Sequence, residues 1–160
     1  MTYSPVSHIG VVLYSHVSPD LEYISLIEST SIGDGFAGVS INRLSTRVAA
    51  YTGKIWVLPL SKKTRFKLDT IAFTSFLVKQ EGKPYDMPQA ILSALDGFVP
   101  SSNENFTKMF CSELVAEALE KGEVIGPVNA SEQTPADVVS YPIYGEPYQI
   151  SGENSELFKE

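Results

Sequence analysis

The residues best suited to catalysis are the only cysteine of the chain, Cys111, and two histidines. Apolar residues around Cys111 recur at helical spacing: Phe110, Leu114, Val115, Ala118 and Leu119. This spacing predicts a helix with Cys111 at its N-terminal end. Because unpaired N–H groups and the helix dipole favour negative charge there, a cysteine in the first turn tends to be partly thiolate. The segment therefore predicts a nucleophile.

A thiolate nucleophile needs a base and a group that orients the base. His8 falls within a predicted strand, residues 7–15, whereas His16 falls in the loop that follows it. Rigid elements hold catalytic geometry better than loop tips do. His8 is therefore the predicted base, and His16 is read as a surface residue.

A predicted β-hairpin supplies the orienting group. Residues 7–15 and 21–30 are rich in β-branched residues and flank a turn-forming Ser-Pro-Asp sequence. Folding symmetrically about Ser18 would set His8 directly opposite Glu28. Opposed residues of an antiparallel pair have Cβ atoms about 4.5–5.5 Å apart on one face. Glu28 is thus the predicted partner of the His8 ring, although a one-residue slip would turn one of the two side chains away.

The remaining pattern places strands first and helices after them, which predicts an α+β fold. Further strands are expected at 38–41, 54–60 and 146–151, and helices at 42–51, 67–82, 89–95 and 134–140, with a polar loop at 101–108. We expect a small antiparallel β-sheet or barrel packed against helices. The length of 160 residues predicts one domain over 1–150, followed by a flexible tail at 151–160.

The amino-acid composition and the net charge disfavour several classes of protein. The single cysteine excludes an internal disulfide, and Met1 is not followed by a secretion signal, so a cytoplasmic location is expected. No apolar run reaches the roughly 20 residues of a membrane-spanning helix. The net charge of −7 disfavours nucleic acid as a partner. One basic run is the exception, and it is read as a solvated face: Lys62, Lys63, Arg65 and Lys67.

Several motifs together resemble a known family. They are SHIGVVL at 7–13, LIEST at 26–30, KPYD at 83–86, FCSELVAEAL at 110–119 and TPADVVS at 134–140. Their order is similar to the circularly permuted branch of the NlpC-type papain-like superfamily, which includes bacterial YiiX-type amidases, some poxviral proteins and, more distantly, lecithin-retinol acyltransferases. In this branch the histidine and the polar residue precede the cysteine. Members usually carry a further strand with a Gly-Asp pair before the histidine, and this sequence has none there.

The resemblance implies a permuted papain-like fold and a role for each candidate. Cys111 would be the nucleophile, His8 the general base and then acid, and Glu28 the orienting residue. Tyr85 matches a tyrosine near the family's pocket, as a substrate contact or oxyanion neighbour. Backbone N–H groups of Cys111 and Ser112, at the expected helix start, would meet the oxyanion.

The predicted function is a cysteine hydrolase, an amidase or peptidase, that cleaves an amide or ester through an acyl-enzyme on Cys111. A lipid acyltransferase or esterase of the same fold is an alternative. A second class is an idle papain-like scaffold that binds a ligand or partner. In that reading Cys111 and His8 are core residues, Glu28 is a solvent-facing strand end and Tyr85 is a packed aromatic residue.

The sequence predicts no cofactor and no metal. Two histidines and one cysteine, far apart along the chain, lack the ligand spacing of a zinc site. The glycines of SIGDGFAG at 31–38 lack the lysine and the strand-to-helix context of a phosphate-binding loop. We expect a small peptide-like or acyl substrate and leave the oligomeric state open.

Overall fold

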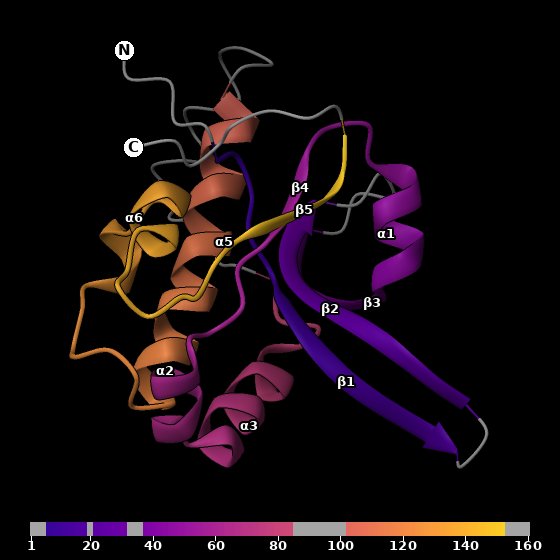
Figure 1. Ribbon diagram of the computed structural model, residues 1–160. Coiled ribbons are helices and arrows are strands. Elements are labelled where there is room, and N and C mark those ends of the chain that lie inside the picture. The colour runs from indigo at the N-terminus through magenta and orange to yellow at the C-terminus, as the bar shows by residue number, and fades with distance from the viewer. Residues whose placement is uncertain (1–5, 19–20, 32–36, 85–101, 153–160) are drawn as a thin grey trace.

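The computed structural model describes residues 6–18, 21–31, 37–84 and 102–152 of the chain (Figure 1). Its elements, in chain order, are β1 (Val11–Ser18), β2 (Leu21–Ser31), β3 (Ala37–Arg43), α1 (Leu44–Ala50), β4 (Ile55–Val57), α2 (Lys62–Lys67), α3 (Thr70–Gln80), α5 (Ser102–Lys121), the 3-10 helix η1 (Ala130–Glu132), α6 (Pro135–Val139) and β5 (Tyr148–Ser151). The mixed α+β class and the small antiparallel sheets expected from the sequence are confirmed.

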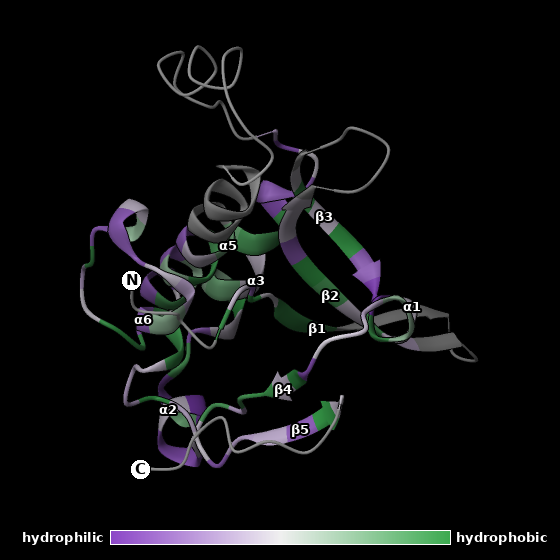
Figure 2. Cartoon of the chain, turned by 90° about the horizontal axis from the view of Figure 1, so that it is seen from above, coloured by the Kyte–Doolittle hydropathy of each residue, from purple (hydrophilic) through white to green (hydrophobic). Residues whose placement is uncertain are grey.

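The strands form two sheets within the described ranges. One has the order β1-β2-β3 with antiparallel neighbours, and the other pairs β4 with β5. Viewed from above, β4 and β5 lie apart from the larger sheet (Figure 2). The predicted hairpin is therefore present, and its two long strands extend beyond the helices (Figure 1).

The register of the hairpin differs from the expected one by two residues. Val11 pairs with Ile27, and Ser18 pairs with Leu21 beyond an irregularity in the strand. Continued toward the N-terminus, this pairing brings Gly10, rather than His8, across from Glu28. A Cβ atom added to Gly10 would lie 3.2 Å from the Glu28 Cβ. The expectation that His8 lies within the strand is also wrong, because β1 begins three residues later.

Helix α5 begins nine residues before the predicted start. Cys111 is the tenth of its twenty residues, so the prediction of a nucleophile at a helix N-terminus is wrong. The polar residues 102–108, predicted as a loop, form the first turns of the helix. An interior helical N–H group already donates to the carbonyl four residues earlier. Neither the helix dipole nor free N–H groups can therefore act on Cys111 through a helix end.

Helix α5 is the central packing element. It contacts β2, α3, η1 and α6, and it lies between the larger sheet and the α6 region in both ribbon views (Figures 1 and 2). Its buried residues recur at helical spacing from Cys111 onward, as the sequence predicted. The core combines apolar side chains of β2, β3, α3, α5 and α6: Ile27, Val39, Phe73, Leu77, Leu114, Val115, Ala118, Leu119 and Val138.

The predicted helix at 67–82 is α3, and a separate short helix that the sequence did not predict, α2, precedes it. Ser61 caps α2 by accepting from the Thr64 N–H, and Asp69 caps α3 by accepting from the Ala72 N–H. Between the caps, the Asp69 N–H donates to the Gly122 carbonyl at the end of α5. Ile71, in the first turn of α3, is 80% exposed.

Other local predictions have mixed outcomes. The capped turn at 134–140 is α6, where Thr134 and Asp137 form a capping box, and the last expected strand is β5. The helix expected at 42–51 is α1, which begins at Leu44 because β3 continues through Arg43. The helix expected at 89–95, Tyr85, and most of the tail lie outside the described residues. No described helix has the length and apolar character needed to cross a bilayer.

Candidate functional site

The structure brings Cys111, His8 and Glu28 together from three parts of the chain. His8 precedes β1, Glu28 lies in β2, and Cys111 lies in α5. The His8 Nε2 atom is 2.8 Å from the Glu28 Oε2 atom. The His8 ring also forms a side-chain hydrogen bond with Cys111. Because Nε2 faces Glu28, Nδ1 is the ring nitrogen left for the sulfur.

The pairing survives the register difference because side chains alternate with a period of two. An offset of two residues preserves the face that a residue would occupy in an extended strand, so His8, although it precedes β1, still approaches Glu28, whereas an offset of one would have turned it away. His8 then reaches Glu28 along the diagonal, from two positions before the directly opposed residue. Long side chains can bridge such diagonal pairs.

His8 carries an elevated pKa. Burial by itself lowers the pKa of a histidine, but hydrogen bonds to Cys111 and Glu28, together with their charges, raise the pKa of His8 from 6.5 to about 9. The ring is therefore protonated at neutral pH. One third of the His8 side chain is exposed, whereas Glu28 is 1% exposed. His8 is thus the member of the set that reaches the surface.

Glu28 is charged although it is buried. Burial favours the neutral carboxyl, but hydrogen bonds and positive charge from His8 and Arg47 outweigh it and lower the pKa of Glu28 below its usual value. Arg47 of α1 donates through Nε to Oε1, at 2.5 Å, and through its terminal nitrogen to Oε2, at 3.3 Å. Two nitrogens of the guanidinium group thus bind the two oxygens of the carboxylate.

Asn42 completes the surroundings of the carboxylate. Its Nδ2 atom donates to Glu28 Oε1, at 3.3 Å, and to Ser40 Oγ, at 2.9 Å. Sequence reasoning missed both Asn42 and Arg47. The signal available was the strand at 38–41, since pairing β3 with β2 sets Ser40 opposite Glu28 and brings Asn42 within reach.

Cys111 is fully buried. Its exposed fraction is 0%, and it lies on the face of α5 that carries Leu114, Val115 and Ala118. The sulfur is covered while its hydrogen-bonding partner His8 is partly open to solvent. A substrate can therefore reach the sulfur only if the groups that cover it move aside.

The position of Ser112 within α5 does not support the predicted role of its N–H group as an oxyanion donor. That role required a helix that begins at Cys111, and the Ser112 N–H group is instead interior to α5. The Ser112 hydroxyl is fully buried and donates to the Gln133 carbonyl at 2.5 Å. This bond joins α5 to the segment between η1 and α6. We therefore assign Ser112 a structural contact.

Two candidates from the sequence remain, His16 and Tyr85. His16 lies in β1, where its backbone pairs with Glu22, rather than in a loop. Tyr85 lies outside the described residues. Among the residues that the structure describes, no three His, Cys, Asp or Glu side chains are placed to hold a metal ion.

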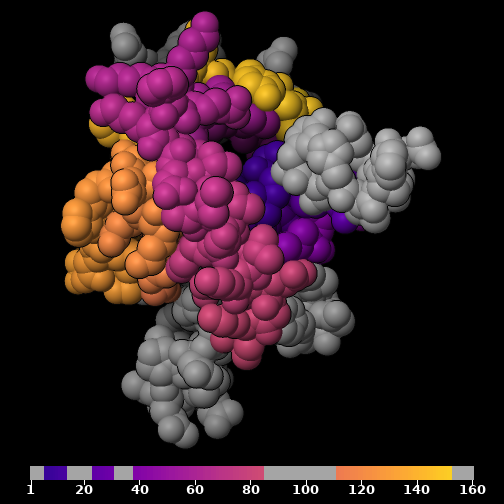
Figure 3. All heavy atoms as spheres, turned by 90° about the horizontal axis from the view of Figure 1, so that it is seen from below, coloured from indigo at the N-terminus to yellow at the C-terminus, as the bar shows by residue number. Residues whose placement is uncertain are grey.

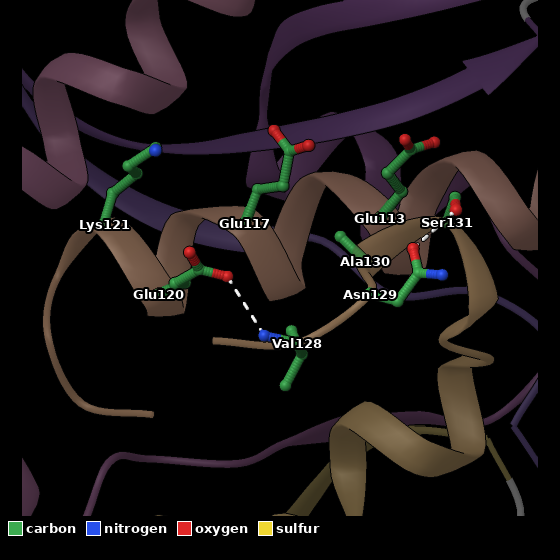
Figure 4. Close-up of a pocket in the computed structure, with 8 residues that line it drawn as sticks. All are labelled: Glu113, Glu117, Glu120, Lys121, Val128, Asn129, Ala130 and Ser131. Atoms are coloured by element: carbon green, nitrogen blue, oxygen red, sulfur yellow. Dashed lines mark hydrogen bonds between the residues drawn. The ribbon is translucent and has the colours of Figure 1, made fainter. Parts of the chain in front are cut away.

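A separate cavity of about 310 Å³ lies on the outer face of α5 (Figure 4). Glu113, Glu117 and Glu120 project along this face, and Glu120 accepts a hydrogen bond from the Val128 N–H. Burial and the charge of Glu117 raise the pKa of Glu113. At 100° per residue, this row is turned away from Cys111. The cavity is therefore distinct from the Cys111 site.

Comparison of the chain with models of protein families, with curated proteins and with solved structures found no match. The resemblance to the permuted papain-like branch is therefore carried by its motifs and by the order of the candidate residues along the chain.

Proposed function

We propose that the protein is a cysteine hydrolase of permuted papain-like type that forms an acyl-enzyme on Cys111. The observation that carries this proposal is the chain of contacts from Cys111 through His8 to Glu28. A cysteine becomes an effective nucleophile when a positioned base shares its proton and a third group holds the base. Three residues from separate elements meet in that order.

The acylation step follows from the protonation of His8. With its pKa at about 9, the imidazolium form prevails at neutral pH and can face a thiolate. The sulfur attacks the carbonyl carbon of an amide or ester, and a C–S bond forms. Imidazolium then gives its proton to the leaving amine or alcohol as the C–N or C–O bond breaks. The products are a thioester on Cys111 and neutral His8.

Deacylation returns the site to its first state. Neutral His8 takes a proton from water while the water oxygen attacks the thioester carbon. The C–S bond breaks, the carboxylic acid leaves, and the thiolate and imidazolium are restored. Glu28 keeps its charge throughout, because it orients the ring and stabilises the imidazolium without accepting its proton. Arg47 and Asn42 hold Glu28 in turn.

A second candidate is a non-catalytic scaffold, and the burial of Cys111 favours it. A thiol that is 0% exposed and lies within a helix is also what a structural core cysteine looks like. In this case the network of His8, Glu28 and Arg47 would link the segment before β1 to β2 and α1 and would catalyse no reaction.

Trapping the acyl-enzyme separates the two candidates. The protein is incubated with a panel of activated esters, thioesters and anilide amides and analysed by intact mass. The proposal expects at least one acyl group on Cys111, which disappears as hydrolysis product accumulates. Cys111→Ser should abolish this turnover, and His8→Ala should slow acylation by about a hundredfold or more.

His16→Gln is the matched histidine control and should leave acylation unchanged. Acylation that is absent across the panel, or that is equal in the native protein and in His8→Ala, would favour the scaffold.

A further inference from the structure

The main basic segment of the chain lies far from Cys111 in the sequence and runs from α2 through α3 to Lys83. Residues 62–83 contain six of the twelve Lys and Arg residues of the chain but only two of its nineteen Asp and Glu residues. The chain as a whole carries a net charge of −7. Positive charge is therefore concentrated in one segment of an acidic protein.

The most exposed large apolar side chain among the described residues lies within this segment. Phe66 is 94% exposed, and Ile71 at the start of α3 is 80% exposed. The α2–α3 surface is defined here by six exposed side chains: Lys62, Lys63, Arg65, Phe66, Lys67 and Ile71. Atoms of both helices lie next to each other on the face of the molecule seen from below (Figure 3).

Helical geometry places Phe66 among the cations. Thr64 is the buried residue of α2, so the side of the helix opposite Thr64 points to solvent. At 100° per residue, Lys62 and Phe66 share this outer side, and Lys63 and Arg65 flank it. Lys62 and Lys63 are the i−4 and i−3 neighbours of Phe66. The ring therefore projects from the centre of a cationic rim.

The fold keeps Phe66 exposed, because contacts at both ends of α2 fix the orientation of this helix. The Ser61 cap and the Thr64 hydroxyl are 2.8 Å apart, and the Ser61 N–H donates to the Ile143 carbonyl at 2.9 Å. Beyond α2, a Cβ atom added to Gly122 of the segment after α5 would lie 2.6 Å from Leu68 Cδ1, which shows how closely Leu68 packs there. Both ends of α2 are thus anchored while its outer side stays open.

We propose that the α2–α3 surface docks the protein on an anionic lipid bilayer, with Phe66 inserted between headgroups and the surrounding cations on lipid phosphates and carboxylates. Lys and Arg side chains on the polar rim and an aromatic ring at the centre are the features that bind the membrane interface. Because the rest of the chain is acidic, this surface is the one that an anionic membrane attracts.

An acidic protein is the competing occupant, and the shape of the surface disfavours it. A stable protein interface buries about 800 Å² on each partner around a contiguous apolar centre. This surface instead has two exposed apolar side chains on separate helices, Phe66 on the six-residue α2 and Ile71 on α3. A bilayer needs only that a ring enters the headgroup region by a few ångströms.

Sedimentation with lipid vesicles tests the inference. The native protein should bind vesicles of phosphatidylcholine with about one-third phosphatidylserine at about 0.1 M salt, and release at about 0.5 M salt because the attraction is screened. It should not bind phosphatidylcholine alone. Lys62→Gln/Lys63→Gln should weaken binding at least about tenfold, since each cation near the surface contributes about fivefold. Phe66→Ser should weaken it about tenfold.

Matched controls separate this surface from general effects. Lys54→Gln/Lys121→Gln removes the same charge elsewhere, and Tyr148→Ser removes an aromatic ring that is 53% exposed. Both should bind like the native protein, as should Cys111→Ala, because docking does not depend on the proposed cysteine chemistry. No binding to anionic vesicles, equal binding by Phe66→Ser, or binding to polyglutamate without binding to vesicles would overturn the proposal.

Discussion

His8 is the residue on which the candidate site depends. It contacts both Cys111 and Glu28, it is partly exposed, and its pKa is raised to about 9. The other two members are buried, so each depends on His8 for its link to the other. A change at Glu28 should therefore be visible first in the titration of this ring.

Glu28→Gln tests that link. Glutamine keeps the shape of the side chain but removes the charge that stabilises the imidazolium, so the pKa of His8 should fall from about 9 toward 6.5. NMR titration of the two histidine rings measures this, with His16→Gln to assign the signals. A His8 midpoint that is the same in the native protein and in Glu28→Gln would contradict the pairing.

At the scale of elements, Ser112 ties α5 to the η1–α6 segment. Its buried hydroxyl donates to the Gln133 carbonyl. Ser112→Ala should lower the free energy of unfolding by about 1–3 kcal/mol, because the carbonyl loses a partner. Urea unfolding measures the change. The control is Ser140→Ala, whose exposed hydroxyl bonds to the Asp137 carbonyl and should cost about 0.5 kcal/mol or less. Equal losses in both variants would contradict the structural role.

Arg47 connects α1 to β2 through Glu28. Arg47→Gln should lower the free energy of unfolding by about 1–3 kcal/mol, since a buried carboxylate loses its bidentate partner while keeping His8 and Asn42. A double-mutant cycle with Glu28→Gln measures the coupling, which should exceed about 0.5 kcal/mol. The control is Arg43→Gln, four residues before Arg47, whose guanidinium lies 5.2 Å from the centre of the Tyr23 ring; it should show no coupling to Glu28→Gln.

The hairpin and the pairing of His8 with Glu28 could be predicted from the sequence, because strand alternation fixes the face even when the register is wrong by two residues. The start of α5 could not. Residues 102–108 are rich in Ser, Asn and Thr, which favour caps and turns over helix interiors. Helix α2 was missed because its basic sequence lacks apolar periodicity. Arg47 and Asn42 join the site through the β2–β3 pairing, which no local pattern reports.

At the scale of the whole molecule, the protonation of His8 couples to stability. Its pKa is higher in the folded protein, about 9, than the ordinary value of 6.5. The folded state therefore binds the proton more tightly. The stabilisation is fully present below about pH 6.5 and is lost as the pH rises through about 9.

Urea unfolding of the native protein and of His8→Gln at about pH 6 and about pH 10 measures this dependence. The native protein should lose about 1–2 kcal/mol relative to His8→Gln over that range. This is less than the difference between pKa values of 6.5 and about 9 would give at 1.36 kcal/mol for each unit of pKa, because one third of the side chain is exposed to solvent. A difference between the two proteins that does not change with pH would contradict the raised pKa.

The rate at which Cys111 reacts with iodoacetamide at neutral pH decides between a nucleophile and a core thiol. A nucleophile paired with His8 should react at least about tenfold faster in the native protein than in His8→Ala, although the groups that cover the sulfur slow both reactions. A thiol that is merely buried should react more slowly in the folded protein than in the unfolded chain, with no change in His8→Ala. That second result would contradict the proposed cysteine chemistry and leave the His8–Glu28–Arg47 network as a structural link.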